Sequence, residues 1–146
     1  MKELAEENKE LEETIISTVE KGNELHDAKY YEGALGEYNK AWELLPEPKL
    51  EWEIAGWIAA CIYSAYFDME AFPKAKEWAE VALQTRGSDI DTAPLIDLGM
   101  VCYELEQYDE SYKYFDAAYN YGKARAFKER PKKYLDFYLA KKKEMK

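Results

Sequence analysis

The sequence predicts an all-α protein built from helical hairpins, on the basis of three observations. Apolar residues recur at helical spacing along almost the whole chain of 146 residues. The chain has only 7 glycines and 5 prolines, too few for a turn-rich β fold. Hydrophobic residues make up 47% of the chain and aromatic residues 15%, which indicates a packed core and excludes a disordered chain. The length suits a single domain, residues 1–146.

The first half is predicted to hold three helices. An apolar stripe that includes Leu4, Leu11 and Ile15 predicts a helix over residues 3–27, and a second helix over residues 32–45 ends at Pro46. The strongly apolar segment 50–66 is predicted as the third helix, followed by a turn.

The second half continues in the same way. Pro73 is expected to open a helix that ends near Gly87, and the polar segment Ser88–Thr92 connects it to the next. Further helices are predicted over residues 93–106, 109–121 and 131–143, with a break at Gly122 and Pro131 opening the last helix.

Two parts of the chain share one spacing. Gly22-to-Tyr31 and Gly99-to-Tyr108 are both nine residues, and Gly22-to-Ala34 and Gly99-to-Ser111 are both twelve. A glycine lets two helices approach closely, the tyrosine fills the turn, and a small residue on the second helix packs against the first.

This pattern resembles the tetratricopeptide repeat, a helical hairpin of 34 residues. The resemblance implies a right-handed solenoid of about three hairpins, residues 3–46, 50–86 and 92–122, with a C-terminal capping helix in residues 123–146.

The middle hairpin departs from the period. Gly22 to Gly56 is 34 residues, but Ala41 to Ala82 is 41, so seven residues are added between its two helices. Seven residues are close to two helical turns and keep the buried face in phase. The helix over residues 50–66 is therefore predicted to protrude beyond its neighbours.

The charge is distributed unevenly along the chain. The net charge is −10, with −17 in residues 1–122 and +7 in residues 123–146. An acidic body argues against nucleic-acid binding, which needs clustered Lys and Arg. The basic tail fits a cap that faces water.

The expected compartment is the cytoplasm. The chain has no apolar run long enough for a membrane span and no signal-peptide pattern at its start. Cys61 and Cys102 lie in apolar stretches and are expected to be free, buried thiols.

The sequence carries no motif for catalysis. The single histidine, His26, has no serine or cysteine nucleophile pattern beside it, and phosphate-binding and dinucleotide-binding fingerprints are absent. We therefore expect no enzymatic activity, no cofactor and no metal, although an enzyme with an unrecognised site stays open.

The resemblance implies a concave groove lined by the first helix of each hairpin. The groove is expected to be acidic with a few apolar anchors, and so to suit a protein with a basic surface. The partner-binding residues it implies are Glu20, Asn23, His26, Asp27, Glu53, Trp57, Asp97, Met100, Tyr103 and Glu104. Packing between hairpins is the alternative role for Trp57 and Tyr103.

Chaperone-binding members of this family hold a peptide carboxylate with basic and amide side chains. Only Asn23 falls on such a position here; the others carry Val19, Ile54, Ala93 and Asp97. An adaptor of that kind is not expected.

Three hypotheses follow for function. The first is a binding module that acts by occupancy, most specifically a bacterial immunity protein that neutralises a cognate toxin. The second is a general scaffold or adaptor for a basic peptide. The third is the enzyme with an unrecognised site. A homo-oligomer through the Leu4, Leu11 and Ile15 stripe is also left open.

Overall fold

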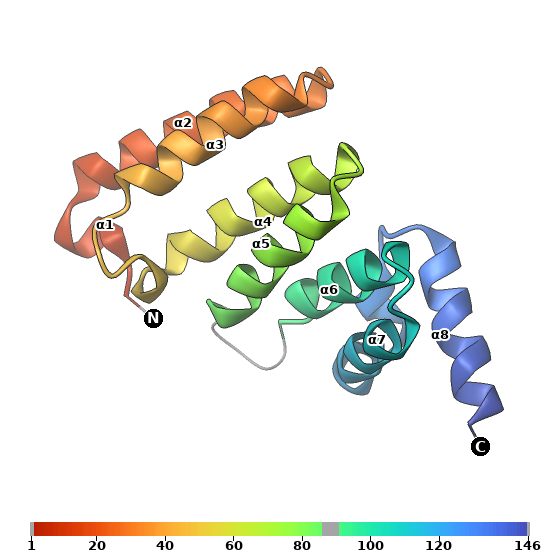
Figure 1. The fold of residues 1–146 in the computed structure, drawn as a ribbon. Helices are drawn as coiled ribbons and strands as arrows, with labels where there is room; N and C mark the ends of the chain where they lie inside the picture. Colours follow the sequence, from red (N-terminus) through yellow and green to blue (C-terminus); the bar gives the residue numbers. More distant parts are fainter. Residues whose placement is uncertain (1, 86–90, 146) are drawn as a thin grey trace. The chain divides into compact units, whose positions relative to one another are not determined.

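The computed structural model describes residues 2–85 and 91–145, and its regular elements in those ranges are helices, apart from one isolated β-bridge. The helices pack as neighbouring antiparallel pairs, α2 with α3, α4 with α5 and α6 with α7 (Figure 1). This confirms the predicted all-α class. The α-helices are α1 (Leu4–Glu7), α2 (Lys9–Asp27), α3 (Tyr31–Leu44), α4 (Glu53–Asp68), α5 (Phe72–Gln84), α6 (Ala93–Glu104), α7 (Tyr108–Gly122) and α8 (Lys132–Glu144). Two short 3₁₀ helices are η1 (Lys49–Glu51) and η2 (Lys123–Phe127).

The chain forms two compact units, Met1–Gly87 and Ser88–Lys146. Two predictions lie partly outside the described residues. They are the end of a helix near Gly87 and the polar connection Ser88–Thr92. None of the described helices is long and apolar enough to cross a membrane.

The start of the first unit is tied to the start of α4. Lys2 donates its backbone N–H to the Glu51 carbonyl at 3.0 Å and accepts the Glu53 N–H at 2.8 Å, so the chain pairs briefly with the segment around Trp52. The single helix predicted over residues 3–27 is broken at Asn8. The Asn8 side chain accepts a hydrogen bond from the Leu11 N–H at 3.1 Å and caps α2.

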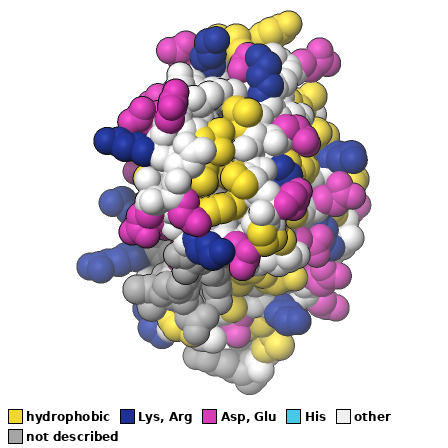
Figure 2. Space-filling view, turned by 90° about the vertical axis from the view of Figure 1, so that its left-hand side faces the viewer, with side chains coloured by type: hydrophobic (Ala, Val, Ile, Leu, Met, Phe, Trp, Pro, Cys, Tyr) yellow, Lys and Arg dark blue, Asp and Glu magenta, His cyan; other side chains and the backbone are white. Residues whose placement is uncertain are grey.

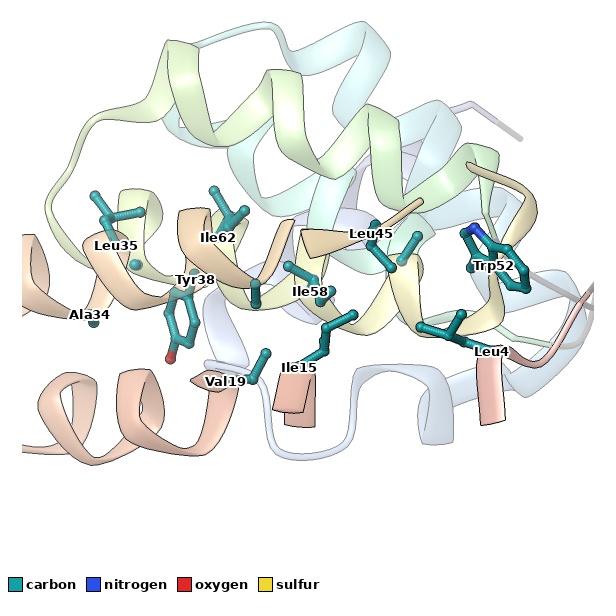
Figure 3. Close-up of a cluster of buried hydrophobic side chains, with 13 residues drawn as sticks. Leu4, Ile15, Val19, Ala34, Leu35, Tyr38, Leu45, Trp52, Ile58 and Ile62 are labelled. Atoms are coloured by element: carbon teal, nitrogen blue, oxygen red, sulfur yellow. The ribbon is translucent and has the colours of Figure 1, made fainter. Parts of the chain in front are cut away.

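The core of the first unit lies between α2, α3 and α4 (Figure 3). One face of each helix supplies it, as the apolar spacing predicted. Tyr38 of α3 is fully buried and reaches toward α2. The other labelled side chains are Leu4, Ile15, Val19, Ala34, Leu35, Leu45, Trp52, Ile58 and Ile62.

The same turn closes all three hairpins. Two residues before each second helix, the backbone enters the left-handed region, with φ of 65° at Lys29, 60° at Glu70 and 62° at Glu106. The next N–H bonds to the carbonyl five residues back, an arrangement typical of helix C-termini. These bonds are Tyr30 N–H to Leu25 O at 2.9 Å, Ala71 N–H to Tyr66 O at 2.9 Å and Gln107 N–H to Cys102 O at 2.8 Å.

An edge-to-face ring pair also bridges each turn, joining the end of one helix to the start of the next. The ring centroids are 5.4 Å apart for His26–Tyr31, 5.2 Å for Phe67–Phe72 and 5.5 Å for Tyr103–Tyr108. Backbone and side chains therefore repeat together, and the hairpin repeat predicted from spacing is present in the structure.

The seven extra residues predicted for the middle hairpin do not make α4 longer than its neighbour, because α4 has 16 residues and α2 has 19. Gly22 and Gly99 each lie five residues before the end of their helix, whereas Gly56 lies twelve before the end of α4. The end of α4 does not protrude past α2, because Asp68 contacts His26 at 2.7 Å. The protrusion predicted there is wrong. Gly56 instead lies away from the turn and faces Thr85 near the end of α5.

The second unit is organised around Phe115 of α7. Its ring contacts Phe127 of η2 at 5.1 Å and Tyr134 of α8 at 6.0 Å between centroids. The Ser111 hydroxyl donates to the Gly99 carbonyl at 2.7 Å and joins α7 to α6. The sequence did not predict η2, in which the buried Phe127 continues the core beyond Gly122.

Candidate partner-binding surface

The candidate residues of α2 divide between surface and interior. Glu20 and Asp27 are exposed, whereas Asn23 and His26 are partly buried. The Tyr38 hydroxyl donates to Asn23 Oδ1 at 2.6 Å and lies 3.3 Å from His26 Nδ1. His26 Nε2 lies 2.7 Å from an Asp68 carboxylate oxygen. Burial, with the nearby Cys61 and Asp27, raises the pKa of Tyr38 well above its ordinary value.

This network links helices and shows no activated nucleophile. His26 joins the turn after α2 to the end of α4, and its ring also forms the aromatic pair of that turn. The Cys61 thiol lies 3.9 Å from Asn23 Oδ1, and burial raises its pKa to about 11. A reactive cysteine has a lowered pKa, and the burial of Cys61 instead favours the protonated thiol at neutral pH.

The candidate residues of α4 border an open depression. Glu53 and Trp57 line it together with Glu3, Glu12 and Ile54, and its volume is about 330 Å³. Trp57 is 40% exposed, whereas Trp52 is 7% exposed. The face turned toward the viewer in Figure 2 shows exposed hydrophobic side chains among acidic and basic ones. We call the five lining residues the Trp57 surface.

The candidate residues of α6 are covered by the C-terminal segment of their own unit. Arg130 Nη1 lies 2.5 Å from Asp97 Oδ1 and 3.2 Å from the Met100 sulfur. Lys133 forms a 2.9 Å ion pair with Glu104.

Rings of α8 cover the rest of this α6 face. The Tyr134 hydroxyl donates to Glu104 at 2.6 Å, and the Tyr103 ring packs edge-to-face on Tyr134 and Phe137. The Lys133 ammonium lies 5.5 Å from the centre of the Tyr103 ring. The acidic face of α6 thus already holds a basic and aromatic helix.

The two carboxylates of α6 respond to this cover in opposite ways. Burial raises the pKa of Asp97, and Arg130 offsets this only in part. Burial also acts to raise the pKa of Glu104, but hydrogen bonds from Tyr134 and Lys133 and the Lys133 charge outweigh it, so the pKa of Glu104 lies below its ordinary value.

The ten candidate residues lie on three helices, α2, α4 and α6. When the hairpins are aligned by their turns, Lys29 matches Glu106, 77 residues later. The same offset takes each α2 candidate to an α6 candidate, for example Asp27 to Glu104, so the two sets are equivalent. The α4 set does not match them, since it was placed by Gly56 and lies two turns away from the equivalent positions. Those positions are Cys61, Ser64, Phe67 and Asp68.

Three side chains central to these contacts were not predicted: Asp68, Arg130 and Lys133. Asp68 could have been found by aligning the aromatic pairs of the turns instead of the glycines. For Arg130 and Lys133 the only signal was the positive charge of the tail, which does not indicate the carboxylates they contact.

No family model matches the chain, and a search of curated proteins finds no match. Within residues 2–85 and 91–145, no three His, Cys, Asp or Glu side chains are grouped so as to hold a metal ion.

Proposed function

We propose that this protein is a non-enzymatic protein-binding module, a tetratricopeptide-like array of hairpins that binds a basic protein partner. The thrice-repeated turn is the observation that supports it most directly. Repeated hairpins each bury one face against a neighbour and leave their remaining faces for binding.

The charge of the two units supports a basic partner. Residues 1–87 hold 19 acidic and 9 basic residues, a net charge of −10, whereas residues 88–146 hold 11 of each. The net acidity thus belongs to the first unit, while α6 carboxylates in the second are paired with Arg130 and Lys133. A surface of one sign attracts a partner of the other and speeds their encounter.

The most specific form of the proposal is a bacterial immunity protein. A cytoplasmic binding module of this kind acts by covering the active site of a basic, nuclease-like toxin. Such an inhibitor is expected to bind with nanomolar affinity or better and to use a surface larger than one depression.

The size of the Trp57 surface favours the second candidate, an adaptor for a basic peptide. A depression of about 330 Å³ accommodates one or two side chains, not a folded domain. An adaptor is expected to bind its peptide in the micromolar range and to lose affinity as salt rises.

Chemical cross-linking in the source organism followed by mass spectrometry would test the proposal, with each recovered protein then purified and titrated into this one. A basic enzyme bound tightly and inhibited supports the immunity form, and weaker salt-sensitive binding of a basic peptide segment supports the adaptor. Direct binding of only acidic or uncharged partners would overturn both.

A further inference from the structure

Acidic side chains beside an aromatic ring also occur in the second unit, at positions that are not equivalent in the repeat, and there they hold cations. In the second unit, acidic residues of α6 beside the Tyr103 ring hold Arg130 and Lys133. In the first unit, acidic residues beside the Trp57 ring line an open depression. The contacts of α6 therefore show that carboxylates beside an aromatic ring bind arginine and lysine side chains in this chain.

The carboxylates of the Trp57 surface are not paired with any cation in the part of the chain that the structure describes. Within the described residues, Glu3, Glu12 and Glu53 form no ion pair. Lys2, which precedes Glu3 in the chain, lies 3.9 Å from Glu51 and 5.7 Å from the centre of the Trp52 ring. Carboxylates that share one depression repel each other, and a cation placed among them relieves that repulsion.

Trp57 is the one tryptophan with an exposed indole. The other three tryptophans are packed: Trp52 is buried, and Trp42 and Trp78 meet edge-to-face at 5.0 Å. Trp57 instead presents its ring to solvent beside the carboxylates. An arginine suits this arrangement because its planar guanidinium stacks on an indole and bonds to carboxylates at the same time.

The surface is also held in place before any partner arrives. The backbone of Lys2, next to Glu3, is hydrogen-bonded to Glu51 and Glu53, and Ile54 packs against the core. Little ordering is then needed on binding, which favours affinity.

We propose that the Trp57 surface is the docking site for a basic helix of the partner protein, with an arginine or lysine side chain inserted beside Trp57 among Glu3, Glu12 and Glu53. This inference rests on the proposed function and names its contact residues. The segment it takes resembles the start of α8, where Arg130 lies just before the helix, Lys133 lies in its first turn, and Tyr134 and Phe137 supply neighbouring rings.

The probe is a synthetic peptide of residues 128–140, titrated into the full-length protein, whose own α8 stays in place. All four tryptophans lie in the first unit, so their indole N–H signals in a ¹⁵N NMR spectrum report on that unit alone. A Trp57→Phe variant identifies the Trp57 signal. We expect this signal to move with saturation while the other three move little.

Two double variants and one altered peptide test whether binding is specific to the Trp57 surface. Glu12→Gln with Glu53→Gln is expected to weaken binding about tenfold, as expected for loss of central contacts. Glu77→Gln with Glu80→Gln removes the same charge from α5 and is expected to change affinity less than twofold, or about 0.4 kcal/mol. A peptide with glutamine in place of Arg130 and Lys133 is expected not to move the Trp57 signal.

The outcomes separate this inference from the function on which it rests. If calorimetry detects binding of the basic peptide but the Trp57 signal stays still, the docking site is wrong and the binding of basic segments stands. If both pairs of glutamine variants weaken binding equally, attraction is by net charge and the specific site is wrong. If the peptide does not bind at all, the inference fails, and the cross-linking experiment decides the proposed function separately.

Discussion

Individual ion pairs in the second unit are expected to contribute unequally to the free energy of unfolding. The Asp97 side chain is 12% exposed and pairs with Arg130, whereas Lys141 pairs with a fully exposed Asp109. A buried carboxylate that loses its partner keeps the cost of leaving water, while an exposed one returns to solvent at little cost.

We therefore expect Arg130→Gln to lower the free energy of unfolding by about 3–5 kcal/mol, the range for breaking a buried pair. Adding Asp97→Asn should recover much of this loss, because the amide carries no charge. Urea denaturation of the single and double variants measures both effects, and Lys141→Gln serves as the control with little change. Equal losses in the single and double variants would contradict this account.

Glu104 gives the second unit a dependence on acid. Its pKa lies below its ordinary value in the folded protein, so it binds a proton more readily when unfolded. Its stabilising contribution is therefore complete above the ordinary carboxyl pKa and is lost as the pH falls through the lower folded value. We expect Glu104→Gln to destabilise the protein at neutral pH and much less near about pH 3, in urea titrations at both pH values. An unchanged difference between the two pH values would show that the carboxylate charge is not responsible.

At the scale of helices, the hairpins depend on close contact at Gly22 and Gly99. A Cβ at Gly22 would lie 2.5 Å from a ring carbon of Tyr38, and one at Gly99 would lie 2.3 Å from Phe115. Both rings are fully buried, so a shift of either ring would disturb the packing around it. Gly36 is also helical, but a Cβ there would meet nothing within 4 Å.

Replacement by alanine should separate these positions. Gly22→Ala and Gly99→Ala are each expected to cost about 1–3 kcal/mol of stability through overpacking. Gly36→Ala is expected to add about 0.5–1 kcal/mol, since alanine favours a helix. Thermal unfolding followed by circular dichroism measures all three, and a stabilising Gly99→Ala would mean that α6 and α7 can move apart.

The sequence predicted helices well because apolar spacing and proline act locally. It placed α3, α6 and α7 within a few residues of their observed ends, and it located Gly22 and Gly99 at the helix contacts of their hairpins. It missed the break at Asn8, where one side chain caps α2. It also treated Gly56 as equivalent to Gly22 and Gly99, although Gly56 lies away from the turn and faces Thr85.

The contacts of the candidate residues were beyond sequence reasoning for a different reason. Spacing correctly put Asp97, Met100 and Glu104 on one stripe, but it carries no information on which distant segment covers that stripe. Arg130 and Lys133 lie about 30 residues away, and only the folded chain brings them there.

At the scale of the molecule, the two units can be followed by different signals, and the second unit depends on its last helix. In the second unit, Tyr134 and Tyr138 of α8 are almost fully buried, so α8 belongs to the core of that unit. All four tryptophans lie in the first unit, and their fluorescence reports on its folding alone.

Truncation before Lys128 is expected to unfold the second unit and to leave the first unit folded. Far-ultraviolet circular dichroism should lose the helical signal of α6, α7 and α8, while the tryptophan emission maximum stays that of the full-length protein. Full-length protein with Lys143→Gln, an exposed change in α8, is the control. A red-shifted emission in the truncated protein would show that the first unit needs the second.

The shared turn leaves a reserve of stability in the chain. Lys29, Glu70 and Glu106 have side chains in a backbone region where glycine is favoured by about 1 kcal/mol or more. Replacing each by glycine should raise the melting temperature, by similar amounts because the three turns have one geometry. The turn that defines the repeat is thus also the simplest place to make this protein more heat-resistant.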